Sequence, residues 1–324
     1  MGQEGYDTII IGGGPAGTAA AVYAARKKMK TLLITEEFGG QSVISSSIEN
    51  WIGDENITGL DLAKRLEKHA RAQEGLEIKS PEKVTKVNET PDCRFEVQTD
   101  KGVYFSKTLI VAPGARRRRL NVPGENELEG KGVAFCSTCD APFFKDQDVA
   151  VIGGGNSALE TAVDLFPYAK KIYLLIRGED LKGNPVTQEK VKQSSQVKLI
   201  QNVEVQEILG DKTVTGLRYK DRRQEEVKEL SVGGVFVEIG SVPNSEFIRN
   251  LVETNEAREI VIDHLTAKTS KEGIFAAGDV TNDPFKQNNI SAGDGVRAAL
   301  SAYNYLLNIK KYSPCEERDT DETM

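Results

Sequence analysis

The chain has few cysteines and no long apolar run. Four cysteines, at positions 93, 136, 139 and 315, stand in 324 residues, and this density is too low for the disulfide framework of a small secreted protein. No apolar stretch approaches the ~20 residues of a membrane span, and the opening residues lack a signal-peptide pattern. We therefore expect a cytoplasmic protein with no membrane partner.

An excess of basic residues is also absent. Lys and Arg number 42 against 49 Asp and Glu, so the formal net charge is −7. This balance disfavours nucleic acid and anionic membrane surfaces as partners. The apolar fraction of 39% is enough to build packed cores. The length is typical of about two domains.

A glycine-rich turn follows the first expected strand. We expect a strand, an alanine-rich helix and a second strand over residues 6–11, 15–29 and 31–34. In a βαβ unit of this length, Gly12 permits the tight turn and Gly14 lets the backbone approach a pyrophosphate, while Gly17 lets helix and strand pack closely. The free N–H groups at the start of the helix then favour the phosphates.

The same arrangement returns in the middle of the chain. Gly153, Gly155 and Ala158 repeat the spacing. They stand after an expected strand over 148–152 and at the start of an expected helix over 157–166. A single motif of this kind is weak, but two in the same context indicate two bound dinucleotides.

The segments that follow the two loops also resemble each other. Residues 235–240 mirror residues 109–114, each after further β-rich runs. We interpret this as a duplication whose second copy is inserted in the first. The predicted fold class is α/β, with two Rossmann-like, three-layer ββα dinucleotide-binding domains. The outer domain is expected over 1–117 and 244–324, and the inserted one over 118–243.

Acidic or basic residues at the strand ends would set the ribose contacts. Glu36 or Glu37 follows the second strand of the outer domain, where an acid is expected to meet a ribose. In the inserted domain the corresponding strand ends at Arg177, with Lys182 nearby. These cations suit a 2′-phosphate and favour NADPH, whereas Glu179 would favour NADH.

Cys136 and Cys139 form a C-x-x-C pair that Asp140 follows directly. Such a pair in a reducing compartment is typical of catalytic dithiol–disulfide exchange. An ionised Asp140 would raise the thiol pKa, so this side chain is better suited to donate and reclaim a proton. Zinc is the alternative, but it needs further ligands, and none is formed by the spacing of Cys93, Cys315, His69 and His264. An inert pair is the third interpretation, and no metal is expected.

Together these motifs resemble the low-molecular-weight thioredoxin reductases over essentially the whole chain. Further matching segments are residues 39–41, 49–51 and 273–280. The resemblance implies a homodimer with FAD in the outer domain and NADPH, or NADH, in the inserted one. It also implies that Cys139 faces the flavin, that Cys136 exchanges with a thioredoxin-like protein, and that Asp140 is the acid–base group.

The resemblance carries over a set of binding residues. The implied FAD site consists of Gly12, Gly14, Pro15, Ala16, Gly17, Glu36, Gly40, Gln41, Asn50, Val84, Gly114, Asp279, Gln287, Asn288 and Ile290. The implied NAD(P)H site consists of Gly153, Gly155, Asn156, Ser157, Ala158, Arg177 and Lys182.

Several interpretations of the function remain open. The leading hypothesis is a thioredoxin-disulfide reductase. Residues 140–144 and 295–303 are similar to the flavoprotein component of alkyl hydroperoxide reductase, so an NADH-using reductase of a peroxiredoxin system is an alternative. A dithiol oxidase using O₂ and a non-enzymatic nucleotide sensor are further ones. The arginine run 116–119 is interpreted as a solvated hinge, or as a patch that docks an acidic partner.

Overall fold

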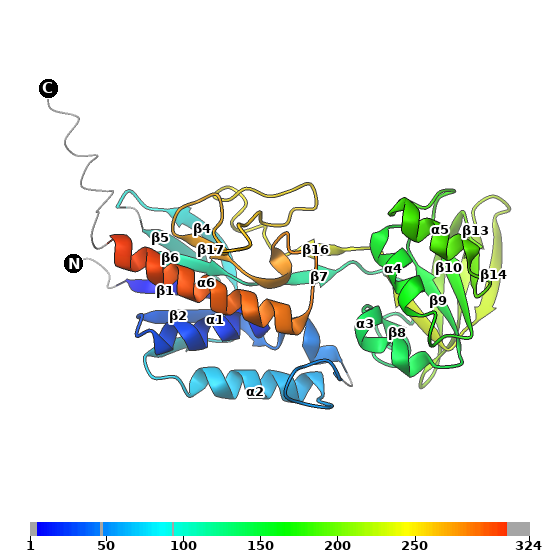
Figure 1. The fold of residues 1–324 in the computed structure, drawn as a ribbon, viewed down its shortest axis with the longest axis horizontal. Helices are drawn as coiled ribbons and strands as arrows, with labels where there is room; N and C mark the ends of the chain where they lie inside the picture. The colour runs from blue at the N-terminus through cyan, green and yellow to red at the C-terminus, as the bar shows by residue number, and fades with distance from the viewer. Residues whose placement is uncertain (1–4, 46–47, 93, 310–324) are drawn as a thin grey trace, which may run out of the picture. The chain divides into compact units, whose positions relative to one another are not determined.

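The computed structural model describes residues 5–45, 48–92 and 94–309 and divides into two compact units. The outer unit consists of Met1–Arg116 and Val242–Met324, and the inner unit of Arg117–Ser241. Figure 1 shows the outer unit in blue, cyan and orange, and the inner unit in green and yellow. Cys93, Cys315 and the expected acidic tail over 313–324 lie outside the described residues.

The outer unit is built on one sheet with strand order β3-β2-β1-β6-β5-β4, and β17 also pairs with β6. Its strands are β1 (Tyr6–Gly13), β2 (Thr31–Phe38), β3 (Leu76–Lys79), β4 (Val84–Glu89), β5 (Phe95–Thr99), β6 (Val103–Val111) and β17 (Ile274–Ala276). β1 runs parallel to both β2 and β6, whereas β4 and β5 form an antiparallel extension. The parallel centre is buried on both faces and therefore consists of continuous apolar runs.

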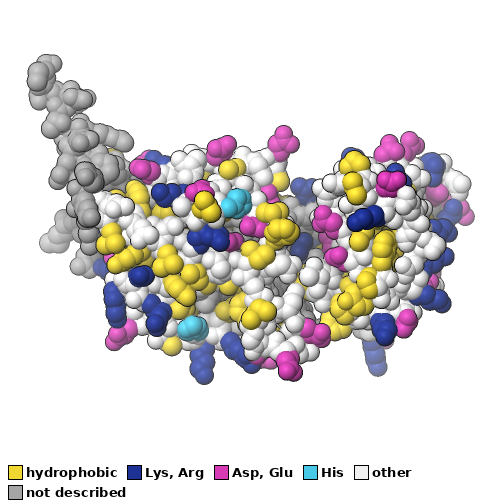
Figure 2. All heavy atoms as spheres, viewed as in Figure 1, with side chains coloured by type: hydrophobic (Ala, Val, Ile, Leu, Met, Phe, Trp, Pro, Cys, Tyr) yellow, Lys and Arg dark blue, Asp and Glu magenta, His cyan; other side chains and the backbone are white. Residues whose placement is uncertain are grey.

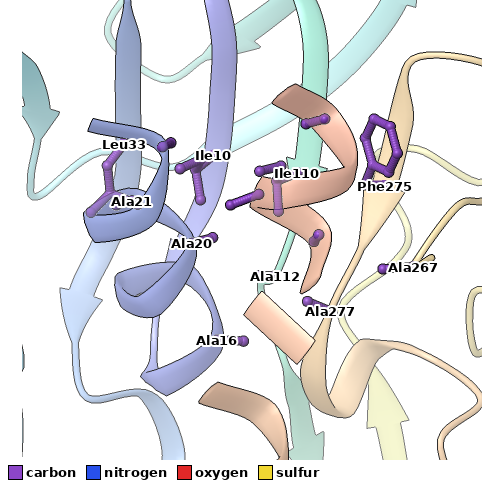
Figure 3. Close-up of a cluster of buried hydrophobic side chains, with 14 of the residues drawn as sticks. Ile10, Ala16, Ala20, Ala21, Leu33, Ile110, Ala112, Ala267, Phe275 and Ala277 are labelled. Atoms are coloured by element: carbon purple, nitrogen blue, oxygen red, sulfur yellow. The ribbon is translucent and has the colours of Figure 1, made fainter. Parts of the chain in front are cut away.

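Two helices lie side by side over this sheet, as Figure 1 shows. They are α1 (Pro15–Arg26) and α6 (Asn288–Ile309), while α2 (Gly59–Arg71) contacts α1 and β2. Alanines of α1 pack with Ile10, Ile110 and Phe275 in one buried cluster (Figure 3). A Cβ on Gly295 would lie 2.0 Å from the Ala16 carbonyl oxygen. Small residues therefore let α6 approach the start of α1 closely.

The inner unit repeats the same plan. Its main sheet has the order β11-β10-β9-β15-β8, all parallel. Those strands are β8 (Val133–Ala134), β9 (Asp148–Ile152), β10 (Lys171–Leu175), β11 (Val197–Ile200) and β15 (Gly234–Val237). A separate antiparallel sheet comprises β12 (Val203–Gly210), β13 (Val214–Asp221) and β14 (Glu226–Ser231). The helices are α3 (Ser137–Asp140), α4 (Asn156–Asp164) and α5 (Pro185–Gln193).

The chain crosses between the units twice, and the two crossings pair with each other. β7 (Ala115–Arg117) and β16 (Ser241–Pro243) form a two-stranded sheet. Gly114 (φ 66°) precedes β7 and Gly240 (φ 95°) precedes β16, so each crossing begins with a left-handed turn that favours glycine. The predicted fold class, with the second Rossmann-like unit inserted in the first, is confirmed.

The element ends differ from the sequence expectation where the backbone leaves the helical region. α1 ends at Arg26, three residues before the predicted end, because Lys28 adopts φ 59°. Such a residue cannot continue a right-handed helix. The edge strands β3 and β11 were not predicted. Each is only four residues long and mostly half-buried, so neither shows a clear apolar pattern.

The surface carries charges of both signs. Figure 2 shows acidic and basic side chains interspersed on the visible face of each unit. Within the described ranges, no helix is both long enough and apolar enough to cross a membrane.

Candidate functional site

The first glycine loop of the outer unit has space for a ligand beside Gly14. A Cβ on Gly12 (φ 110°) would lie 2.2 Å from the Ala112 carbonyl oxygen, and one on Gly17 would lie 1.8 Å from the Gly12 carbonyl oxygen. A Cβ on Gly14 would meet nothing within 4 Å. Gly12 and Gly17 therefore allow close packing of the chain on itself, whereas Gly14 borders open space.

The start of α1 is suited to an anion. Gly14 is the N-cap and has no side chain to cap the helix, and Pro15 occupies the first turn. The backbone N–H groups of Ala16 and Gly17 thus stand at an uncapped helix N-terminus, where the helix dipole favours negative charge. This cradle, with its open position at Gly14, fits the pyrophosphate of a dinucleotide.

Two segments that are far apart in the sequence complete this side of the outer unit. They are joined by hydrogen bonds from Gln41 Nε2 to Asp279 Oδ2 (3.2 Å), from Ser42 Oγ to Asn288 Oδ1 (2.9 Å) and from Asn50 Nδ2 to Gln287 Oε1 (3.4 Å). Five of the predicted FAD residues therefore take part in these cross-links. They are Gln41, Asn50, Asp279, Gln287 and Asn288.

The remaining predicted FAD residues lie at the ends of neighbouring elements. Glu36 is exposed near the end of β2 and pairs with Lys83 at 3.4 Å. Val84 begins β4 and is buried. Gly114 has a left-handed backbone, and a Cβ there would meet nothing within 4 Å. Gly40 opens the 3₁₀ turn Gly40–Ile44, and Ile290 lies in the first turn of α6.

The second glycine loop, in the inner unit, repeats this construction. A Cβ on Gly153 (φ 141°) would lie 2.1 Å from the Glu238 carbonyl oxygen, whereas one on Gly155 would meet nothing within 4 Å. Gly155 is the N-cap of α4 and leaves the helix uncapped. Asn156 and Ser157 are exposed in the first turn, and Ala158 is fully buried beneath it. The loop therefore has a second uncapped helix N-terminus beside open space, which fits a pyrophosphate.

The cations expected to meet a 2′-phosphate flank this cradle. The Lys182 N–H donates to the Gly154 carbonyl oxygen over 2.7 Å, which places Lys182 beside the loop. Arg177 follows β10 and pairs with Glu204 at 3.8 Å. Arg222 Nη1 donates to the Arg177 carbonyl oxygen over 3.4 Å. Arg222 comes from the turn after β13 and was not predicted, because its position depends on the pairing of the second sheet.

The dithiol pair lies at the start of α3, as predicted. Cys136 is the N-cap of α3, and it forms a disulfide with Cys139 across a Cα–Cα distance of 5.4 Å. The Asp140 N–H donates to the Cys136 carbonyl oxygen over 3.0 Å and closes the turn. Burial raises the pKa of Asp140 to about 6, with Arg117 opposing the shift. This carboxyl is thus able to exchange a proton near neutral pH.

Two contacts around the dithiol were not predicted from the sequence. The Ser137 hydroxyl donates to Asp164 Oδ2 over 2.7 Å. Glu238, 7% exposed, makes a side-chain hydrogen bond with Thr161, and its charge is coupled to that of Asp140. Asp164 and Thr161 are both on α4, the helix that begins at the second glycine loop. No local pattern signals these contacts, because they depend on how α3, α4 and β15 pack.

The side chains of the arginine run 116–119 have separate partners within the chain, and its interpretation as a solvated hinge or as a docking patch stays a prediction. The Arg116 guanidinium bonds Asn244 and Glu246, each at 2.7 Å. The Arg119 guanidinium pairs with Glu129 and lies 5.0 Å from the centre of the Phe135 ring. The charge of Arg117 lowers the pKa values of Asp140 and Glu238 against the larger, opposite effect of burial. Successive side chains of a strand point in opposite directions, so Arg116 and Arg117, both in β7, reach different partners.

The part of the chain that the structure describes contains no group of three or more His, Cys, Asp or Glu side chains able to hold a metal ion.

Comparison with known proteins finds similarity over nearly the whole chain. The model of the pyridine nucleotide-disulphide oxidoreductase family matches residues 6–299. A solved thioredoxin reductase from Streptococcus pyogenes is 35% identical with a TM-score of 0.87, covering 94% of this chain and 98% of that one. The thioredoxin reductase from Giardia duodenalis is 31% identical with a TM-score of 0.88, covering 94% and 100%.

Curated relatives carry other names. "NADH dehydrogenase" of Bacillus subtilis is 42% identical over 306 residues, and the F component of alkyl hydroperoxide reductase of Pseudomonas aeruginosa is 43% identical over 312 residues. Each match covers 94% of this chain but 59% of the relative. The chain thus spans about three fifths of the length of these relatives.

Proposed function

Because the chain belongs to the pyridine nucleotide-disulphide oxidoreductase family, we propose that it is an FAD-dependent disulfide reductase that uses a nicotinamide nucleotide. The observation that carries this proposal is the Cys136–Cys139 disulfide in the same unit as the second glycine loop. A nucleotide sensor would not need a disulfide turn with a protonatable acid beside it.

The outer unit would hold the flavin nucleotide. The uncapped start of α1 would bind its pyrophosphate, Glu36 a ribose, and the polar residues around Asp279 its more distal part. When bound, FAD would supply two-electron chemistry between the nicotinamide and the disulfide. The cradle at Gly14 fits such a group, since it is lined by N–H donors and leaves room for phosphate oxygens.

The inner unit would bind the nicotinamide nucleotide and carry the dithiol. The start of α4 would bind the pyrophosphate. Arg177 and Lys182 support NADPH, because both are exposed beside the loop and a 2′-phosphate needs cations. NADH is the second candidate, since Glu204 already pairs with Arg177 and the Bacillus subtilis relative is named NADH dehydrogenase.

Asp140 would serve the dithiol as its acid and base. Reduction of the disulfide breaks the S–S bond and leaves one thiol and one thiolate once a single proton has been added. Asp140 follows Cys139 directly, and its raised pKa keeps a share of the carboxyl protonated near neutral pH. The carboxyl can therefore give that proton to a sulfur and reclaim it in the next exchange.

The electron acceptor would be a disulfide of a thioredoxin-like protein, and the chain would act as a homodimer in the cytoplasm. Structures named thioredoxin reductase support this acceptor over nearly the whole chain. The relatives named as the F component of alkyl hydroperoxide reductase support instead a role in which the electrons pass on to a peroxidase. Both assignments require the same exchange at Cys136 and Cys139.

A coupled assay with thioredoxin tests the proposal. The FAD-loaded protein is mixed with NADPH or NADH and oxidised thioredoxin under argon, and the loss of reduced nucleotide is followed. We expect oxidation of the nucleotide that stops when thioredoxin is fully reduced, and none in the Cys136→Ser variant. Oxidation that requires O₂ and leaves thioredoxin oxidised would contradict a reductase. Sedimentation of the same sample tests the dimer.

A further inference from the structure

The antiparallel sheet of the inner unit reaches the end of β10 next to the second glycine loop. The Asn202 N–H, just before β12 begins at Val203, donates to the Gly178 carbonyl oxygen over 3.0 Å. The Gly153 N–H donates to the Leu175 carbonyl oxygen, the last of β10, over 3.0 Å. The end of β10 is therefore bonded both to the glycine loop and to the segment that leads into the second sheet.

Arg222 is held at the end of β10 by its backbone and by its side chain. Its N–H donates to the Asn202 carbonyl oxygen over 2.8 Å, and its Nη1 donates to the Arg177 carbonyl oxygen over 3.4 Å. Arg222 is exposed, and among the residues that the structure describes no acid forms an ion pair with it. Its positive charge is thus available to an anionic ligand that lies at the end of β10.

Glu204 brings the opposite charge to the same place. Its carboxylate lies 3.8 Å from Arg177 Nη2, and the two side chains are 51% and 75% exposed. Lys220 stands opposite Glu204 in the pairing of β12 with β13, but the Lys220 side chain pairs with Glu225. An anion that binds the Arg177 guanidinium therefore has to compete with Glu204 for it.

The end of β10 is where coenzymes of this kind are distinguished. In a Rossmann-like unit the adenosine ribose lies beyond the second strand, where an acid bonds the 2′-hydroxyl of NADH or an arginine accepts the 2′-phosphate of NADPH. Both signs of charge are present here, since Arg177 and Arg222 stand beside Glu204. The balance between them decides how strongly a 2′-phosphate is held.

We propose that the antiparallel sheet sets the coenzyme choice of the inner unit: Arg222 supplies a second cation for the 2′-phosphate, and Glu204 weakens the contact of that phosphate with Arg177. Both are specificity-determining residues. The proposal rests on the proposed function in one respect, namely that the second glycine loop binds a nicotinamide nucleotide. It does not depend on the dithiol or on the protein that the dithiol reduces.

Equilibrium binding of NADP⁺ and NAD⁺ tests the role of Arg222, because these oxidised nucleotides differ only by the 2′-phosphate. Calorimetry with the FAD-loaded, full-length protein gives both dissociation constants. In Arg222→Ala we expect the Kd for NADP⁺ to rise about tenfold, as for the loss of one charged hydrogen bond, and the Kd for NAD⁺ to stay unchanged. Arg222→Lys keeps the charge and should recover most of the loss. Arg223→Ala, at the neighbouring exposed cation, is the matched control.

The same measurement tests Glu204 with the opposite expected sign. In Glu204→Gln the Kd for NADP⁺ should fall about two- to fivefold, because an exposed ion pair contributes little and Arg177 no longer has to break one. The Kd for NAD⁺ should stay unchanged. Glu207→Gln is the matched control, since Glu207 is also on β12 but pairs with Arg218 at 2.7 Å.

The salt dependence of binding provides a readout that a purely structural role would not change. Screening weakens contacts between exposed charges, so added salt should raise the Kd for NADP⁺ less in Arg222→Ala than in the wild type. A ratio of the two dissociation constants that stays at the wild-type value in Arg222→Ala and Glu204→Gln overturns the proposal. Equal shifts in these variants and in their matched controls overturn it as well.

This inference and the proposed function fail in different ways. A protein that binds NADP⁺ and NAD⁺ but shows no change of their ratio in the variants overturns the inference alone. A protein that shows the expected shifts but does not reduce thioredoxin contradicts the proposed acceptor alone. Binding of neither nucleotide contradicts both.

Discussion

The Ser137 hydroxyl donates a hydrogen bond to Asp164 Oδ2 over 2.7 Å, and this bond joins the disulfide turn to the last residue of α4. The other end of α4 is the uncapped N-terminus at Gly155. One helix thus supports both the expected pyrophosphate site and the dithiol.

Replacing Ser137 by Ala should destabilise the inner unit. The substitution removes a hydrogen bond to a carboxylate, and such bonds contribute about 1.5–3 kcal/mol. Urea unfolding followed by fluorescence would measure the loss. Thr138→Ala is the matched control, because Thr138 is exposed between the same cysteines, whereas the bond to Asp164 comes from Ser137. Equal stability of the two variants would contradict a structural role for the Ser137 contact.

Alanine substitutions at Gly14 and Gly17 should have different effects. Gly17→Ala places a methyl group 1.8 Å from the Gly12 carbonyl oxygen, so the fold should lose stability, by about 1–3 kcal/mol for a clash in packed surroundings. In Gly14→Ala the added methyl group lies in open space, so without FAD the variant should unfold at the same temperature as the wild type. It should bind FAD more weakly, because the methyl group occupies space that the cofactor needs. Thermal melts with and without FAD measure both effects. Tight FAD binding by Gly14→Ala would argue against a cofactor in this cradle.

Asp140→Asn should stabilise the oxidised protein above about pH 6. Burial raises the pKa of Asp140 from 3.8 to about 6 in the folded state. Between pH 3.8 and pH 6 the folded state therefore binds more protons than the unfolded state. Stability contributed by this carboxyl is thus present at low pH and declines as the pH rises towards 6. Asn carries no charge, so the variant avoids the cost of an ionised carboxylate in a poorly hydrated place. At pH 7 its free energy of unfolding should exceed that of the wild type by roughly 1–3 kcal/mol. Denaturation at pH 4.5 and 7.5 checks this, and an equal difference at both pH values would contradict it.

Arg177→Ala should raise the KM for NADPH about tenfold and leave that for NADH unchanged, because a lost contact to a charged group costs about 1.5–3 kcal/mol. Steady-state rates with each nucleotide provide the test. Arg223→Ala serves as the control, since Arg223 is also an exposed cation. Equal effects of Arg177→Ala on both nucleotides would show that no 2′-phosphate is bound at Arg177.

The sequence predicted the features that depend on residues close together in the chain. The need for glycine at Gly12, Gly17 and Gly153 can be recognised from a few neighbouring residues. The spacing of Cys136 and Cys139 is that of one helical turn. The inserted fold could be inferred because its βαβ signal occurs twice.

Contacts between residues that are distant in the chain could not be predicted from the sequence. The charge of Asp140 raises the pKa of Glu238. This depends on the pairing of β15 with β9, in a register that sets Val237 opposite Ile152. The arginine run 116–119 suggests one patch, yet its side chains find separate partners. Neither outcome can be derived from spacing, because each depends on residues that are distant in the sequence.

Anaerobic titration of the FAD-loaded protein with NADPH or NADH, with thiols counted at each step, tests the account most directly. We predict that the flavin band bleaches and that two new thiols per chain then appear at Cys136 and Cys139. In Cys139→Ser the flavin should still bleach, while thioredoxin added afterwards stays oxidised. A wild-type protein whose flavin is fully reduced while the Cys136–Cys139 disulfide remains intact would contradict the proposed electron path.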